Sequence, residues 1–507
     1  MKHIITRKRW SRACYAFATT MVIAASSSVF AAKGYEVWVS DQTNSAGISA
    51  MNDTGTHGGF IRLYDGDCLE SKKTECPAGG STVIDVADWA SNIGTPTRLH
   101  GMLPSPNHNY MNVNFVSSGH LAIVDARTRD VVALFRSTGT DTGRQNHMSF
   151  WSPDGKYLLV SNQNGKLLER VNISWDENGE NIVAAVWDKT ATLDLAGDLS
   201  SRLVAGQEAI ADTANYPLGS VSGGYAAQSA STPNGLPKQD AATRPNNTNI
   251  CPIVGSEGKA YVTLGGGGMF VVDYRTTPMA IVAEYDRVNV HAAGCGGIES
   301  GGEVYMNTGT PGPDISEFTV YRFPLEYPDA PGFNAPNTPA PEIVFADPDN
   351  GMLIHGNNRD AHGMTVTRNG KYLHQFDRVR NNVEVFRTKH LTRETYWLTT
   401  ADGEDPAQGA PAGNACGTTL GATTSNDPTP DLLDIDPKGK RIYVALRGPF
   451  PLSVTHAAVG SCPGLGIVEL QKDGRSGILT KVLPTFHSNF AGDRNISDPH
   501  GAIVRLK

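Results

Sequence analysis

Short runs of alternating apolar and polar residues recur along the chain, and turns rich in glycine and asparagine separate them. The clearest run is His362–Leu373 (HGMTVTRNGKYL): a histidine, an apolar strand, a tight turn with a glycine, and the start of a second strand. The same pattern recurs without a gap at His147–Leu158 (HMSFWSPDGKYL) and at His100–Met111 (HGMLPSPNHNYM). Alternation with a period of two residues predicts half-buried β-strands, and repetition of one unit predicts a repeat architecture.

Further copies of this unit extend the series. Asp431–Ile442 keeps the turn and both strands but has an aspartate at the histidine position. His291 opens a looser copy, His500 opens a copy that stops with the chain, and strict spacing places Ile250 at the same position of another unit. Seven such four-stranded units predict an all-β, seven-bladed β-propeller, with six- and eight-bladed rings as the alternatives.

The two ends of the chain predict how this ring closes. Three strands at Tyr35–Asp41, Gly59–Tyr64 and Thr82–Val86 lack an inner strand, whereas Gly501–Leu506 is an inner strand with nothing after it. We therefore expect the C-terminal strand to join the N-terminal blade, because closure removes exposed sheet edges.

Two long segments interrupt the repeat. Residues 196–247 and 401–430 are rich in small residues and proline and have no clear period. Loops on a rigid scaffold often carry function, so we expect these two to cover a mouth of the central channel. Residues 32–507 are otherwise predicted to form a single propeller domain.

Residues 1–31 have the composition of a secretory signal peptide. Basic residues precede a short apolar stretch at Ala16–Ala25, and Val29-Phe30-Ala31 supplies a cleavage position, so the mature chain is expected to begin at Ala32. The apolar stretch is too short to span a bilayer, and no later stretch is long enough. These features predict an exported, periplasmic protein without a membrane span.

The net charge of the mature chain limits the kinds of partner that it is expected to bind. Removing the five basic residues of the signal from the 43 in the chain leaves 38 basic against 51 acidic side chains, a net charge of about −13. Such an acidic balance argues against nucleic acid or an anionic membrane surface as the partner.

The six cysteines outside the signal predict three disulfides, since an even number in an oxidising compartment is typical of disulfides. Sequential pairing is expected, and it joins Cys68 to Cys76, Cys251 to Cys295, and Cys416 to Cys462. The alternative is that Cys251 or Cys295 is a thiolate metal ligand. The chain has no CxxCH motif, so it attaches no c-type haem.

The residue that opens each unit carries the candidate chemistry. In a propeller the innermost strand of each blade lines the channel, so a residue at its start lies at one mouth. Imidazole is the commonest neutral ligand of copper, zinc, iron and nickel. We therefore predict an axial metal site, with copper as the expected cofactor, from His100, His147, His291, His362, His500 and Asp431.

Nearby charged residues are expected to orient these ligands or to bind an anionic substrate, namely Arg98, Arg144, Arg359 and Asp360. The alternative for the histidines is a structural role, inherited by duplication, in which each holds neighbouring strands by a hydrogen bond. A hydrolase or lactonase with a hard cation would need several Asp, Glu or Asn residues at the mouth, so the histidines disfavour that function.

Two resemblances sharpen these expectations. SPDGKYLLVSN (152–162) and DPKGKRIYVAL (436–446) resemble the blades of YVTN-type seven-bladed propellers, which implies the fold and little about function. NHMSFWSPDGKYLLVSN, HGMTVTRNGKYL and DPHGAIVRL are similar to blade-entry motifs in the copper propellers of nitrous oxide reductase and thiocyanate dehydrogenase. That resemblance implies that the five unit-opening histidines bind copper.

The chain also departs from nitrous oxide reductase. It has no pair of adjacent histidines and no cupredoxin domain after the propeller, so the resemblance does not extend to nitrous oxide reduction. A small-molecule oxidoreductase that passes electrons to a separate periplasmic carrier remains the expected function. The alternative is a non-catalytic propeller that binds or scaffolds a partner in the cell envelope.

Overall fold

The computed structural model describes residues 34–42, 58–71, 76–228, 230–232, 235–291, 294–308, 318–327, 338–347, 359–411, 413, 415–416, 426–449, 459–487 and 495–507. The predicted signal peptide and its cleavage position lie outside these residues. The unit formed by Gly34–Lys507 is described below.

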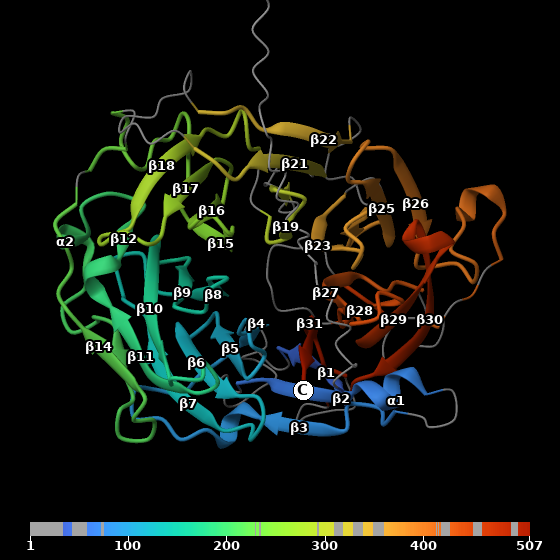
Figure 1. The fold of residues 1–507 in the computed structure, drawn as a ribbon, viewed down its shortest axis with the longest axis horizontal. Helices are drawn as coiled ribbons and strands as arrows, with labels where there is room; N and C mark the ends of the chain where they lie inside the picture. Colours follow the sequence, from blue (N-terminus) through green and yellow to red (C-terminus); the bar gives the residue numbers. More distant parts are fainter. Residues whose placement is uncertain are drawn as a thin grey trace, which may run out of the picture. The chain divides into compact units, whose positions relative to one another are not determined.

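Seven sheets, each with an antiparallel core of four strands, follow one another around a common centre in this unit, which is a seven-bladed β-propeller as predicted (Figure 1). Each blade is named here after its innermost strand. The β4 blade contains β4 (Leu99–Pro104), β5 (Tyr110–Phe115), β6 (His120–Asp125) and β7 (Val131–Arg136). The β8 blade contains β8 (Asn146–Trp151), β9 (Tyr157–Asn162), β10 (Leu167–Trp175), β11 (Ile182–Asp188) and the short β12 (Leu193–Asp194).

Four further blades continue the series in chain order. The β15 blade contains β15 (Asn249–Val254), β16 (Lys259–Leu264), β17 (Met269–Asp273) and β18 (Ala280–Tyr285). The β19 blade contains β19 (Gly297–Ser300), β20 (Glu303–Thr308), β21 (Thr319–Pro324) and β22 (Glu342–Ala346). The β23 blade contains β23 (Ala361–Val366), β24 (Tyr372–Asp377), β25 (Asn382–Arg387) and β26 (Arg393–Trp397). The β27 blade contains β27 (Pro430–Ile435), β28 (Arg441–Leu446), β29 (Gly464–Gln471) and β30 (Ser476–Pro484).

The remaining blade joins the two ends of the described chain, which confirms the predicted closure. Its strands are β3 (Thr82–Asp85), β2 (Phe60–Asp65), β1 (Tyr35–Asp41) and the C-terminal β31 (Pro499–Leu506). β31 pairs antiparallel with β1, from Tyr35 opposite Leu506 to Asp41 opposite Pro499. The innermost strands contact their neighbours around the ring, β31 with β4 and β27, β4 with β8, β8 with β15, and β23 with β19 and β27.

Part of the long segment 196–247 lies on the outside of the ring instead of over its channel. The helix α2 (Leu199–Arg202) is followed by β13 (Ile210–Ala211), which adds to β7, and by β14 (Gly219–Ser222), which runs parallel to β11. Both partners are outer strands of their blades. The described residues 401–411 likewise contact outer strands, since Gly403 accepts a hydrogen bond from Trp397 of β26.

Apolar residues fill the spaces between neighbouring blades. Ile61 and Leu63 of β2, for example, share one buried cluster with Met111 and Val113 of β5. Each fully buried side chain of this size stabilises the fold by about 1.5–3 kcal/mol, so the blade-to-blade contacts hold the ring together. The other described helices are α1 (Gly66–Glu70) and 3-10 turns at Val86–Asp88, Lys189–Ala191, Pro406–Gln408 and Lys472–Gly474.

Three disulfides join the cysteines in the predicted sequential order, Cys68 to Cys76, Cys251 to Cys295 and Cys416 to Cys462. Disulfides persist in oxidising compartments, so these three indicate an exported environment. In the described part of the chain, no helix has the length and apolar character that crossing a membrane requires.

Candidate metal centre

A β-bulge at the start of the innermost strand positions the candidate ligands. In β4, Leu99 pairs with Phe115 and Met102 pairs with Val113, so two residues of β4 face one residue of β5. An extra residue of this kind bends the strand and redirects its side chains. The same shift in register occurs at the start of β8, β15, β23, β27 and β31.

The first bulge residue is the residue that opens each sequence unit. In each of these six strands it is the second residue. The six residues are His100, His147, Ile250, His362, Asp431 and His500. Hydrogen bonds from the neighbouring blade hold two of these bulges: Ser40 donates to the backbone oxygen of His100 at 2.8 Å, and Asn307 donates to that of His362 at 2.7 Å. The repeated register therefore brings four of the five predicted histidines and Asp431 to equivalent places.

His291 is not among them. It lies six residues before β19 and is exposed, where its ring contacts Tyr321 of β21 at a centroid distance of 6.5 Å. The pairing of Gly297 with Met306 makes Cys295 the equivalent of His100 in this blade. The connection from β19 to β20 is two residues shorter than that from β4 to β5, and His291 lies four residues before Cys295, so a cysteine takes the place predicted for His291.

His362, Asp431 and His500 form one buried group of potential ligands. Their donor atoms all lie within 4.8 Å of one another. His362 Nε2 lies 2.9 Å from Asp431 Oδ1, and His500 Nε2 lies 3.9 Å from Asp431 Oδ2. The side chain of Asp431 is fully buried, so solvent does not compensate its charge.

His100 and His147, on the next two blades around the ring, extend this group. The His100 ring stacks on the His500 ring at a centroid distance of 3.8 Å, and His100 Nε2 lies 3.1 Å from His147 Nε2. Two ligands of one ion with metal–nitrogen bonds of about 2.0–2.1 Å lie about 2.8–3.4 Å apart. The spacing between these imidazole nitrogens, and that between His362 and Asp431, therefore fits shared ligands of a metal ion.

Two arginines that the sequence reasoning missed hold Asp431 in place. Arg447 Nη1 donates to Asp431 Oδ2 at 2.5 Å, and Arg378 Nη1 donates to the same oxygen at 3.4 Å. Each arginine is held in turn by another buried carboxylate, Arg378 by Asp360 at 2.6 Å and Arg447 by Asp498 at 2.6 Å. The second carboxylate oxygen of Asp431, Oδ1, faces His362.

A positional signal in the sequence marks these arginines. Arg378 directly follows β24 and Arg447 directly follows β28, the second strands of their blades. Gln42 follows β1, the second strand of the closing blade, and its Nε2 contacts Nδ1 of His100. The residue after the second strand therefore supports the candidate ligands in three blades.

The four predicted supporting residues have different surroundings. Asp360 supports Asp431 through Arg378, as expected of a residue that orients a ligand. Arg98 is close enough to His100 to lower the pKa of that imidazole, and its buried Nε has no hydrogen-bond partner in the described structure. Arg359 instead binds Asp347, Asp377 and Glu384, and Arg144 donates to the backbone of Ser137, so these two serve the blades themselves.

Burial sets the protonation of this group. It holds the pKa of His100 and of His500 well below the ordinary value, and the neighbouring imidazoles add to the effect on His100. Burial alone would raise the pKa of Asp431, but the positive charges beside it, among them Arg378 and Arg447, keep it well below the ordinary value. Neutral imidazoles and an ionised carboxylate are the protonation states that bind metal.

The tautomer of His500 directs a lone pair at Asp431. His500 Nδ1 lies 3.1 Å from the backbone oxygen of His100, and only a protonated Nδ1 can make that hydrogen bond. In a neutral imidazole Nε2 then carries the lone pair, as it does in metal-binding histidines whose other nitrogen donates to a carbonyl. Two electron-pair donors, His500 Nε2 and Asp431 Oδ2, thus face one another in a buried place, an arrangement that a cation between them stabilises.

A second group of potential ligands lies beside the first. His147, Cys251 and Cys295 have donor atoms within 4.8 Å of one another, and Cys251 Sγ lies 3.9 Å from His147 Nδ1. The two cysteines are joined in a disulfide, so neither sulfur is a thiolate in this form.

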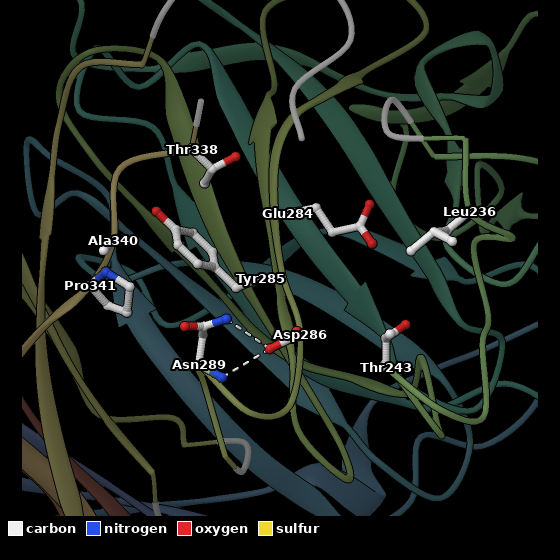
Figure 2. Close-up of a pocket in the computed structure, with 9 residues that line it drawn as sticks. All are labelled: Leu236, Thr243, Glu284, Tyr285, Asp286, Asn289, Thr338, Ala340 and Pro341. Atoms are coloured by element: carbon white, nitrogen blue, oxygen red, sulfur yellow. Dashed lines mark hydrogen bonds between the residues drawn. The ribbon is translucent and has the colours of Figure 1, made fainter. Parts of the chain in front are cut away.

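A pocket elsewhere on the ring contains none of the predicted ligands (Figure 2). Its lining includes Glu284 and Tyr285 of β18, together with Asp286, Asn289 and residues that precede β22. β18 and β22 are the outermost strands of their blades, so this pocket is at the outer edge and not at the channel.

Comparisons with known proteins support the fold. No family model matches the chain. Protein tipD of Dictyostelium discoideum is 25% identical over 190 residues, which are 30% of each protein, so the chain spans less than a third of that curated relative. A hypothetical selenium-binding protein of Sulfolobus tokodaii superimposes with a TM-score of 0.52 at 11% identity over 94% of both chains. A putative 6-phosphogluconolactonase of Bacteroides fragilis gives a TM-score of 0.45 at 12% identity, over 93% of this chain and 98% of that chain.

Proposed function

We propose that this propeller is a periplasmic metalloprotein that binds copper on its axis and acts as a small-molecule oxidoreductase. The observation that carries the proposal is the opposition of His500 Nε2 and Asp431 Oδ2, two electron-pair donors in a buried group with His362. A histidine with a structural role has a hydrogen-bond donor that faces an acceptor. Two metal ligands instead present electron pairs to one cation that lies between them. The geometry therefore favours the ligand role over the inherited structural role.

Copper is the proposed ion for two reasons. Imidazole nitrogen and carboxylate oxygen together suit Cu(II), and Cu²⁺ has the highest affinity of the divalent first-row ions for such a donor set. The likeness of the blade-entry motifs to those of copper propellers agrees with this choice. His100, His147, His362, His500 and Asp431 would hold the metal, which when bound would polarise a substrate and accept its electrons.

The residues of the chain have separate tasks in this function. Arg378 and Arg447 fix Asp431 through Oδ2 and so keep Oδ1 turned toward His362. Arg98 offers a partly buried positive charge beside His100, which suits recognition of a small anion. A separate electron carrier would reoxidise the centre. The signal-like residues 1–31 and the disulfides support an envelope location.

Metal analysis of the exported protein tests the proposal. The full chain is produced in copper-replete cells, and bound metal is measured by elemental analysis beside the double variant His362→Ala, His500→Ala. Electron paramagnetic resonance reports whether nitrogen ligands surround Cu(II). We expect about one or more copper ions per chain, with nitrogen coupling, and loss of both in the double variant.

The variant His291→Ala is the matched control, because His291 is exposed and lies outside the group. It should retain the full copper content. Equal metal content in all three proteins, or none in the wild type, would contradict the metal site and favour a non-catalytic propeller that binds a partner. If copper is confirmed, reduction of the Cu(II) signal by candidate anions then identifies the substrate class.

A further inference from the structure

We propose that Cys251 and Cys295 form a second metal site with His147 once a dithiol has reduced their disulfide. The ion would be a soft or borderline one, such as Cu(I) or Zn²⁺, because two thiolates and an imidazole select such ions. The site would be absent in the oxidised protein. The two groups share His147, whose Nε2 faces His100 and whose Nδ1 faces Cys251.

The position of the two cysteines in the repeat supports this function. Cys295 occupies the place in the β19 blade that is equivalent to His100, where four other blades carry a histidine and one carries Asp431. Cys251 is the second bulge residue of the β15 blade and directly follows Ile250. The two blades without a histidine or aspartate at this position are therefore the two that contribute a sulfur atom, Cys295 at the position and Cys251 directly after it.

His147 faces both groups at once. Its Nε2 lies 3.1 Å from His100 Nε2, and its Nδ1 lies 3.9 Å from Cys251 Sγ. The α-carbons of Cys251 and Cys295 are 5.2 Å apart, close enough for both sulfurs to reach one ion. Within the described residues, neither the Cys68–Cys76 nor the Cys416–Cys462 disulfide belongs to a group of potential ligands.

A dithiol supplies the two electrons and two protons that reduction of the Cys251–Cys295 disulfide requires. One thiolate of the dithiol attacks a sulfur of the Cys251–Cys295 bond, which breaks and leaves the other cysteine as a thiol. The second dithiol sulfur then attacks the mixed disulfide, releases the oxidised dithiol and frees the second thiol. Two electrons and two protons pass from the dithiol to the cysteines, and binding of the ion to both sulfurs releases these protons.

Cobalt binding tests the proposal, because thiolate-bound Co²⁺ has a charge-transfer absorption in the near ultraviolet. The full exported protein is reduced with dithiothreitol without denaturant, freed of reductant under anaerobic conditions, and titrated with Co²⁺. We expect one additional equivalent of Co²⁺ with this absorption in the reduced protein and none in the oxidised protein. Equal titrations of the two forms would overturn the proposal.

Variants assign the signal to its residues. The pair Cys251→Ser, Cys295→Ser should lose the absorption, whereas Cys416→Ser, Cys462→Ser should keep it after the same reduction. The pair His362→Ala, His500→Ala should also keep it, which separates this site from the axial copper site. An absorption that persists without Cys251 and Cys295 would contradict the assignment.

Alkylation of the wild-type protein gives a readout that needs no variant to fold. After native reduction the protein is treated with iodoacetamide, and its peptides are identified by mass spectrometry. Labelling of Cys251 and Cys295 before any denaturant is added supports a reducible pair, and protection of both by prior addition of Zn²⁺ supports the site. If the two cysteines are labelled only after denaturation, the disulfide is structural and the proposal fails.

Discussion

Replacement of Asp431 by asparagine should destabilise the propeller even without metal, because Asp431 balances two buried arginines. Its Oδ2 accepts hydrogen bonds from Arg447 at 2.5 Å and from Arg378 at 3.4 Å, and all three side chains are fully buried. The amide has nearly the same shape but no charge. The variant therefore isolates the electrostatic contribution.

The size of the destabilisation depends on the partners that Arg378 and Arg447 keep in the variant. Removing one member of a buried ionic group costs about 3–5 kcal/mol. Arg447 keeps Asp498 and Arg378 keeps Asp360, so we expect the lower end of this range, about 3 kcal/mol. For Gly34–Lys507 the entropy of unfolding is about 1 kcal/mol/K, so the melting temperature should fall by about 3 °C.

Differential scanning calorimetry of the metal-free, disulfide-intact protein measures this shift. The control is Asp434→Asn on the same strand, whose Oδ2 accepts the backbone N–H of Val504 at 3.1 Å and whose Oδ1 accepts that of Ile435 at 2.7 Å, so that an amide oxygen can keep one of these two bonds. Loss of one neutral hydrogen bond costs about 1 kcal/mol, so we expect the control to lower the melting temperature by about 1 °C. If the two variants shift it equally, Asp431 is not the charge that Arg378 and Arg447 require.

Three further substitutions test other parts of the account. Burial raises the pKa of Glu169 from 4.5 to about 7, so its contribution to stability is present below about pH 4.5 and is lost as the pH rises through 7, a fall of about 3 kcal/mol. Chemical denaturation at pH 5 and pH 8 should show that the stability of the wild type relative to Glu169→Gln falls by about 2–3 kcal/mol between the two pH values, because the buried histidines titrate in both proteins alike; an unchanged difference would argue against it. A Cβ added in Gly363→Ala would lie 2.2 Å from the backbone oxygen of Asp431, so the variant should lose copper in elemental analysis and about 1–3 kcal/mol of stability; full copper content would show that the ring tolerates the shift. His291→Ala should leave the melting temperature unchanged within about 1 °C, and a larger fall would give this exposed side chain a role that its surroundings do not explain.

The sequence predicts the fold because its signals repeat. The tight turn and the residue that opens each unit keep one spacing at His100, His147, His362 and Asp431, and each of these residues is the second residue of an innermost strand. The closing strand is equally predictable, since a three-stranded N-terminal blade and a lone C-terminal strand complete one another.

The site is less predictable, for two physical reasons. His291 resembles the other unit-opening histidines, but the connection between the two inner strands of its blade is two residues shorter and His291 lies further before the strand, so that Cys295 occupies the equivalent place. Arg378 and Arg447 follow second strands, and only the folded blade brings that end of the strand next to Asp431. Spacing along one strand is readable in the sequence, whereas contacts between strands depend on the pairing that the fold creates.

The most direct test of the axial metal site is a crystal structure of the copper-loaded protein with anomalous scattering measured on both sides of the copper absorption edge. We expect an anomalous peak on the axis within bonding distance, about 2.0–2.2 Å, of His500 Nε2 and an oxygen of Asp431. Peaks only at the surface, or direct hydrogen bonds closing the gap between His500 and Asp431 in copper-replete protein, would contradict it.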